Sequence, residues 1–310
     1  MYATGSASTP SALLAALETF AVSAGWTVSR SQSAGVPPGG ASNDLWTSLV
    51  KGGCHLNFNY IDSSSIYVNY LADGFNGSAA PGAQSSITQA NASYMNPGRA
   101  PYTAYFFFSS TSGTYLHVVL EWEASVYTHL HGGLLNAQGG ASPCMYSAST
   151  AWSYGGSQES YPDAGVNIAP FSMVANNNAT QVFLTVDGTK AYFQQPYGPG
   201  LRLITAMRTG GLQQRGVMRT PNTFNELTVL YPCHFAVERA TTGVYSYIGE
   251  APDIRVCNIA NVNPQDEVTL GSDVWKYFPV TAKTPPSTWN GFNNGIISSG
   301  NYGIALKKSA

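Results

Sequence analysis

The chain has 310 residues, which is long enough for one large β-domain or two smaller ones with a well-buried core. Only 10% of its residues are charged, against roughly 25% in average domains, whereas it contains 19 Tyr and 32 Gly. The net charge is -2, and Lys307-Lys308 is the only adjacent basic pair. This argues against nucleic-acid binding as the main activity, because phosphate neutralisation needs clustered cations.

Because few residues are charged, the surface is polar but costs little free energy to desolvate when a partner binds. Tyrosine adds contact area with few rotatable bonds, which suits interfaces. The sequence has no stretch of 18 uninterrupted apolar residues, so we expect no membrane span. Residues 1–6 lack the basic and apolar segments of a secretory signal, so we expect synthesis and folding in a cytoplasm.

A helix is predicted over residues 10–24. Thr9 is placed to cap its first turn, Pro10 fits the first helical position, and Gly25 fits the position after its end. Leucines and alanines recur at helical spacing and form an apolar stripe that needs a sheet to cover it.

Short strands follow the helix, and most of them alternate apolar and polar residues. Residues 55–60 and 66–71 predict a hairpin with one buried face, and 182–186 and 190–193 flank the turn pair Asp187-Gly188. The other predicted strands are 104–108, 115–122, 125–131, 227–231, 234–239, 244–248, 254–258, 267–270, 275–280 and 302–306. This pattern predicts a mainly β to α+β fold of antiparallel, sandwich-like sheets with one N-terminal helix.

Long loops rich in Gly, Ser and Asn separate these strands, notably residues 73–101 and 136–165. Loops of this length are uncommon in compact domains and usually serve a function or an interface. We expect them to be contact arms, so that deleting residues 76–96 leaves a folded monomer that does not assemble. Residues 1–310 are expected to form one intertwined domain, with a boundary near 195–200 or inside 136–165 as the alternative.

The four cysteines are Cys54, Cys144, Cys233 and Cys257, with no C-x-x-C spacing. In a reducing compartment they are predicted to be buried thiols that behave as small apolar residues. The alternative is oxidation after cell lysis, within or between subunits, and Cys233 and Cys257, which lie in neighbouring predicted strands, are the internal disulfide pair that this alternative favours.

His129 and His131 point to the same side of a predicted strand, because side chains alternate with period two. Two such imidazoles can hold a metal ion only with a third ligand, for which His117, Glu121 and Glu123 are the candidates. The competing interpretation, a polar strand face or an interface, is the more common one. We therefore predict no metal and no cofactor.

Glu121 and Glu123 are expected on one strand face, where paired carboxylates resemble those of glycosidases. No second acidic group has a fixed spacing to them, so solvent-facing strand charges are the preferred interpretation. The sequence also lacks a nucleophile elbow, a P-loop and a dinucleotide fingerprint. We predict a non-enzymatic protein with no catalytic residues.

Three stretches at the beginning, middle and end of the chain form a further pattern. They are residues 2–5 with 13–20 and 25–28, then His129-Leu130-His131-Gly132-Gly133-Leu134-Leu135, then residues 247–255, 271–279 and 303–308. Together they resemble a family of uncharacterised virion structural proteins of tailed bacteriophages. The resemblance implies a virion component, present in several copies around a symmetric tail at the baseplate or neck.

The leading hypothesis is therefore a structural tail protein whose partners are copies of itself and other phage tail proteins. Closed rings need heterologous contacts between copies. The alternatives are a host-surface recognition module that binds carbohydrate or protein, and a cell-wall-degrading enzyme. Candidate interface residues are the aromatic side chains of Tyr94, Trp152, Tyr154, Tyr161, Trp275 and Tyr277.

Overall fold

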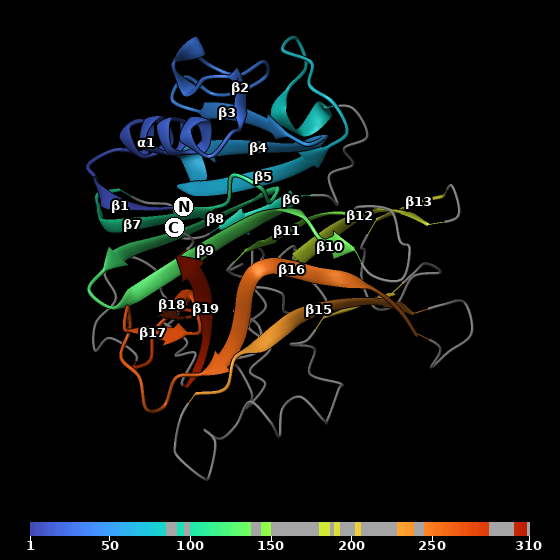
Figure 1. Cartoon of the computed structure of the whole chain (residues 1–310). Coiled ribbons are helices and arrows are strands. Elements are labelled where there is room, and N and C mark those ends of the chain that lie inside the picture. The colour runs from blue at the N-terminus through green and yellow to red at the C-terminus, as the bar shows by residue number, and fades with distance from the viewer. Residues whose placement is uncertain are drawn as a thin grey trace, which may run out of the picture.

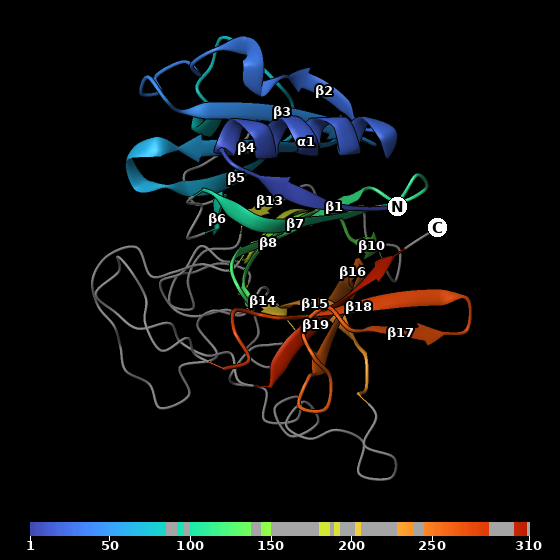
Figure 2. The ribbon, with the colours of Figure 1, turned by 90° about the vertical axis from the view of Figure 1, so that its left-hand side faces the viewer.

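The computed structural model describes residues 1–84, 92–95, 100–137, 144–149, 180–186, 189–192, 202–205, 228–238, 245–284 and 301–308. These residues form three antiparallel β-sheets and a single α-helix, which confirms the predicted fold class. The sheets are stacked in three layers, with the helix beside the upper two in the view of Figure 1 and in the turned view of Figure 2.

The middle layer, which we call the central sheet, contains seven strands in the order β1-β7-β8-β9-β11-β12-β13. Its strands β7, β8 and β9 are consecutive in the chain, and β1 joins their edge from the start of the sequence. The bounds are β1 Tyr2–Ala7, β7 Tyr102–Ser109, β8 Tyr115–Glu123, β9 Val126–Leu134, β11 Met145–Ser149, β12 Thr180–Val186 and β13 Thr189–Tyr192.

The N-terminal sheet lies on one face of the central sheet, in the strand order β2-β3-β4-β5-β6. The predicted hairpin is confirmed as β4 and β5, which pair from His55 opposite Ala72 to Ile61 opposite Ile66. The bounds are β2 Thr27–Arg30, β3 Leu45–Lys51, β4 Cys54–Ile61, β5 Ile66–Ala72 and β6 Ala92–Met95, with short 3₁₀ turns at η1 Gln32–Ala34, η2 Asp62–Ser64 and η3 Pro81–Ala83.

The C-terminal sheet covers the other face of the central sheet, in the order β14-β15-β16-β19-β18-β17, and β10 pairs with β16. The sequence predicts two strands at 244–248 and 254–258, whereas residues 245–248 and 254–258 belong to one long strand, in which Asp253 has a positive φ of 54°. The bounds are β10 Asn136–Ala137, β14 Arg202–Thr205, β15 Tyr231–Glu238, β16 Tyr245–Asn258, β17 Glu267–Leu270, β18 Asp273–Pro279 and β19 Tyr302–Lys308.

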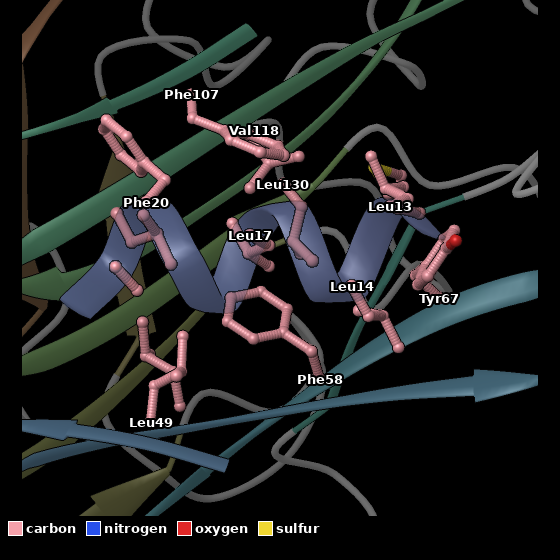
Figure 3. Close-up of a cluster of buried hydrophobic side chains, with 14 of the residues drawn as sticks. Leu13, Leu14, Leu17, Phe20, Leu49, Phe58, Tyr67, Phe107, Val118 and Leu130 are labelled. Atoms are coloured by element: carbon pink, nitrogen blue, oxygen red, sulfur yellow. The ribbon is translucent and has the colours of Figure 1, made fainter. Parts of the chain in front are cut away.

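Helix α1 (Pro10–Ser23) forms where the sequence predicts it. The Thr9 hydroxyl accepts a hydrogen bond from the Ala12 amide (3.1 Å), and Gly25 takes the positive φ of 84° that ends many helices. Figure 3 shows the apolar side chains of α1 between two sheets. Leu49 and Phe58 of the N-terminal sheet lie on one side, and Phe107, Val118 and Leu130 of the central sheet lie on the other.

The described part of residues 73–101 is folded against the N-terminal sheet. Gln84 is buried, and its amide nitrogen donates to the carbonyls of Asn76, Ala79 and Ala80. Residues 92–95 are strand β6, in which Ser93 and Met95 are buried. The expectation of a separate contact arm is therefore wrong for these residues, and deleting 76–96 would remove a strand of the sheet.

The position of α1 between two sheets leads to a first prediction. Leu17 is 3% exposed in this layer, so Leu17→Ala is expected to lower the free energy of unfolding by about 2–5 kcal/mol through lost burial and a residual cavity. Urea unfolding measures the change. Val22→Ala, at a helix position that is 55% exposed, is the control and should stay within about 0.5 kcal/mol. Equal effects at both positions would contradict the packing.

Candidate functional site

The three histidines that the sequence singled out lie together. His117 of β8 is directly opposite His131 of β9, and His129 precedes His131 by two residues on the same face. All three are fully buried. The ring centroid of His131 is 4.9 Å from that of His117 and 5.5 Å from that of His129. The cluster thus occupies one face of the central sheet.

Two of these imidazoles bond to the backbone of the C-terminal layer. His117 Nε2 lies 2.9 Å from the carbonyl oxygen of Pro252, and His129 Nε2 lies 2.8 Å from that of Pro279. Because a carbonyl only accepts, each Nε2 carries the proton and donates it. Phe278 contacts the ring of His129 edge-on. The histidines therefore connect two layers of the fold.

Further polar contacts flank the histidines on the same face. At one end the Tyr115 ring stacks on His117, with centroids 4.6 Å apart, and its hydroxyl donates to the Asp253 carboxylate (2.5 Å). At the other end the side-chain amide of Gln265 donates to Glu121 (3.1 Å) and to the Tyr127 hydroxyl (3.0 Å).

We call this set of contacts the polar seam. From the central sheet it comprises Tyr115, His117, Glu121, Tyr127, His129 and His131, and from the C-terminal layer it comprises Pro252, Asp253, Gln265 and Pro279.

Unusual backbone conformations gather at the polar seam. Among the described residues, four non-glycine residues have positive φ, and three of them, Ser125, Asp253 and Gln265, touch this seam. Ser125 donates its amide to Glu121, and the other two bond through their side chains. Such conformations persist where the surroundings impose them, and they cluster at active sites, ligand clamps and switch regions. The seam is therefore a strongly specified contact.

Burial controls the electrostatics of the histidines. It lowers the pKa of His117 and of His129 to about 4, although the carbonyl bonds, and for His117 the Asp253 charge, act in the opposite direction. Burial also lowers the pKa of His131 well below its usual value, and the two neighbouring imidazoles add to this effect. At neutral pH the cluster is uncharged. Two charges about 5 Å apart would repel by about 3 kcal/mol at an effective dielectric constant of about 20.

The arrangement does not correspond to a metal centre. The described residues contain no group of three His, Cys, Asp or Glu placed to hold a metal ion. The Nε2 atoms of His117 and His129 are already bonded to carbonyl groups. Glu121, named as a further ligand, bonds instead to Ser125 and Gln265. His117 and His129 thus use their Nε2 atoms in the contact between layers.

The expectation that Glu121 and Glu123 share one face is wrong. Glu121 is opposite Tyr127 and Glu123 is opposite Val126, with a register shift between them. Tyr127 and Val126 are adjacent in β9 and point to opposite faces, so the bulge sends the two carboxylates to different sides. Glu121 is 8% exposed, whereas Glu123 is more exposed.

The glycines after His131 do not end the strand, as the sequence suggested, but belong to β9. Gly133 lies between Tyr115 of β8 and Tyr146 of β11. A Cβ atom there would lie 2.5 Å from the Tyr115 Cα, and φ is 155°. The absence of a side chain at Gly133 therefore lets the backbone of β9 approach the backbone of β8 closely at Tyr115, a residue of the seam.

The candidate interface residues need a correction. Trp275 is 6% exposed and Tyr277 is 3% exposed, so this chain itself buries both rings. The Arg255 guanidinium stacks over Trp275 at 5.1 Å. Tyr94 lies in β6, but its side chain is outside the described residues, as are Trp152, Tyr154 and Tyr161.

The cysteines are buried thiols, as predicted. Cys233 packs in the apolar cluster between the central and C-terminal sheets, whereas Cys257 packs in a separate cluster with Trp275 and Tyr277, so the suggested disulfide is not formed. Burial raises the pKa of Cys144 to about 11 and that of Cys233 to about 12. It raises the pKa values of Cys54 and Cys257 as well.

Comparison with known proteins leaves the resemblance to phage virion proteins as a prediction. No protein-family model matches the chain, and no curated protein is significantly similar to it. Within the described residues, no helix is long and apolar enough to cross a membrane.

The polar seam yields a second prediction. Gln265→Ala removes a donor from the buried Glu121 carboxylate and is expected to cost about 1–3 kcal/mol of stability. Asn43→Ala removes an amide–carboxylate bond of the same length, 3.1 Å, between exposed Asn43 and Asp62, and is the matched control. It should change stability by less than about 0.5 kcal/mol. Chemical unfolding of both variants measures the difference, and a Gln265→Ala cost no larger than the control would count against the seam.

A third prediction concerns the cysteines. Because all four are buried and burial raises their thiol pKa values, an aromatic disulfide reagent should not label the native protein at mildly alkaline pH. All four should react after unfolding in denaturant. Absorbance of the released thiolate follows the reaction, and rapid labelling of the native protein would contradict the packing.

Proposed function

We propose that this protein is a structural component of a bacteriophage tail, at the baseplate or neck, which assembles through β-rich contacts with copies of itself and other tail proteins. The observation that carries the proposal is the location of the three stretches that resemble phage virion proteins. The middle and last stretches meet at the joint between the central and C-terminal sheets, and Tyr2 of the first stretch contacts Lys308 of the last, so the resemblance covers residues that pack on one another.

The contacts are direct. His129, in the middle stretch, bonds to the carbonyl of Pro279 in the last stretch, and the ring of Phe278 packs against it. Tyr2, in the first stretch, packs on Phe108, and the ammonium group of Lys308 lies 4.8 Å from its ring centroid. Segments from both ends and the centre of the sequence thus specify one scaffold, which is what an architectural subunit requires.

The sheet edges support assembly through strands. β17 ends the C-terminal sheet and is largely exposed, and the described residues place no strand beyond it. Its Glu267 is paired within the chain to Lys276 (3.1 Å) and Lys308 (3.0 Å). An exposed edge strand presents backbone donors and acceptors to a neighbour, and internal pairing of its charge reduces the repulsion of an incoming strand.

A fourth prediction tests the proposed function. Mass spectrometry of purified particles of the phage that encodes this chain should detect it in several copies per virion. A cryo-EM map of the tail should show the three-layer fold repeated around the axis at the baseplate or neck. A non-structural protein of the same phage serves as the control and should be lost on purification.

Three outcomes would contradict this function. The first is absence of the chain from purified particles. The second is a location only at fibre tips, together with binding to host glycans, which would favour host recognition. The third is hydrolysis of host peptidoglycan by the purified chain, which would favour the enzyme.

A further inference from the structure

The central sheet is held to its two neighbours by contacts of different chemistry. Towards the N-terminal sheet and α1, the contact is an apolar cluster with hydrogen bonds between neutral side chains, Asn69 Nδ2 to Ser147 Oγ (2.9 Å) and Tyr67 to Tyr102 (2.8 Å), and the Lys51 ammonium donates to the Ser110 carbonyl (2.6 Å). Both tyrosines are neutral at any pH well below 10, and burial raises their pKa values further, so acid does not change their charge. Towards the C-terminal sheet, the contact contains three imidazoles.

We propose that the polar seam is an acid-sensitive clasp: proton uptake by His117, His129 and His131 opens the joint between the central and C-terminal sheets, while the N-terminal sheet, α1 and the central sheet stay packed. This inference goes beyond the proposed tail function and does not depend on it.

The geometry makes protonation unfavourable in the closed joint. All three rings are fully buried, and His131 lies 4.9 Å and 5.5 Å from the other two, centroid to centroid. The Nε2 atoms of His117 and His129 already donate to carbonyls, so an added proton must go to Nδ1. The resulting cations would repel one another beside the ring of Phe278.

The other ionisable groups at this joint provide little compensation. From β16, Asp253 acts on His117, but it is also bonded to Tyr115 and lies 4.0 Å from Lys307 of β19. The Tyr146 hydroxyl of β11 and the Cys233 thiol of β15 have pKa values raised by burial and remain neutral.

At the far end of the seam the charged groups are paired with other partners. Glu121 of β8 is bonded to Gln265, and Lys276 of β18 to Glu267. Of the three imidazoles, His117 has a described carboxylate neighbour, Asp253.

The direction of the pH dependence follows from these positions. In the closed joint, burial holds the pKa of His117 and His129 at about 4, whereas an exposed histidine titrates near 6.5. The open state therefore binds more protons between these values. Acidification from about pH 6.5 to about pH 4 favours opening, and the opening constant rises up to about tenfold per pH unit for each histidine that titrates.

The test is hydrogen exchange of the full chain, read by mass spectrometry between about pH 7 and about pH 4 and corrected for intrinsic rates. Amides of β16, β18 and β19 should lose protection by up to about tenfold per pH unit for each seam histidine that titrates, while β3, β4 and β5 keep theirs. In the double variant His117→Gln and His129→Gln, the glutamine amide can still donate to each carbonyl but does not titrate, so most of the slope should disappear.

The chain has five histidines, and the remaining two, His55 and His234, provide the control. His234 is exposed and His55 is partly exposed, so His55→Gln with His234→Gln should retain the native slope. Parallel loss of protection in β3–β5, or an unchanged slope in the seam variant, would overturn the clasp.

If the seam variant does not fold, an NMR titration of the native imidazoles decides the question. Proton uptake by the three seam histidines should coincide with loss of protection in the C-terminal sheet. Uptake without that loss would overturn the clasp.

Discussion

A sheet covered on both faces must satisfy each of its polar side chains with partners from the layers on either side. The central sheet has this constraint, because nearly every residue of β8, β9 and β11 is buried. His117, Glu121 and His129 project from it towards the C-terminal sheet. The carbonyls of Pro252 and Pro279 and the amide of Gln265 provide their partners. Asp253 and Gln265, which have positive φ values, thus contribute side chains to the contact between the C-terminal and central sheets.

Part of the fold could be predicted because its signals are local. The Thr9 cap, the apolar stripe of α1 and the alternation of residues 55–60 and 66–71 each depend on neighbours in sequence. Strand β1 was missed because Tyr2–Ala7 has small residues and little alternation, and its pairing with β7 spans about a hundred residues. The bulge between Glu121 and Glu123 was missed for the same reason, since only the partner strand defines it.

The histidines of the candidate site could be predicted from the sequence, but their partners in the C-terminal layer could not. Period-two geometry placed His129 and His131 on one face, and the neighbouring strand was expected to bring His117 near them. Their partners carry no signal of their own, because a proline carbonyl becomes an acceptor only where tertiary packing places it. The informative feature was the presence of polar side chains in strands otherwise rich in Leu and Val, which predicts a polar partner on the covering layer.

The high tyrosine content, which suggests assembly when the sequence is considered alone, also contributes to packing inside the molecule. Three stacked sheets create two interfaces that need large side chains, and Tyr67, Tyr115, Tyr127 and Tyr146 are among the largest fully buried residues. Trp275 and Tyr277 are likewise covered by their own chain. Much of the described tyrosine therefore stabilises the stack of layers, and abundant tyrosine alone is a weak argument for subunit contacts. The argument for a tail component rests more firmly on the low charge, the exposed edge strand β17, and the contacts that join the middle resembling stretch to the last and Tyr2 of the first stretch to Lys308 of the last.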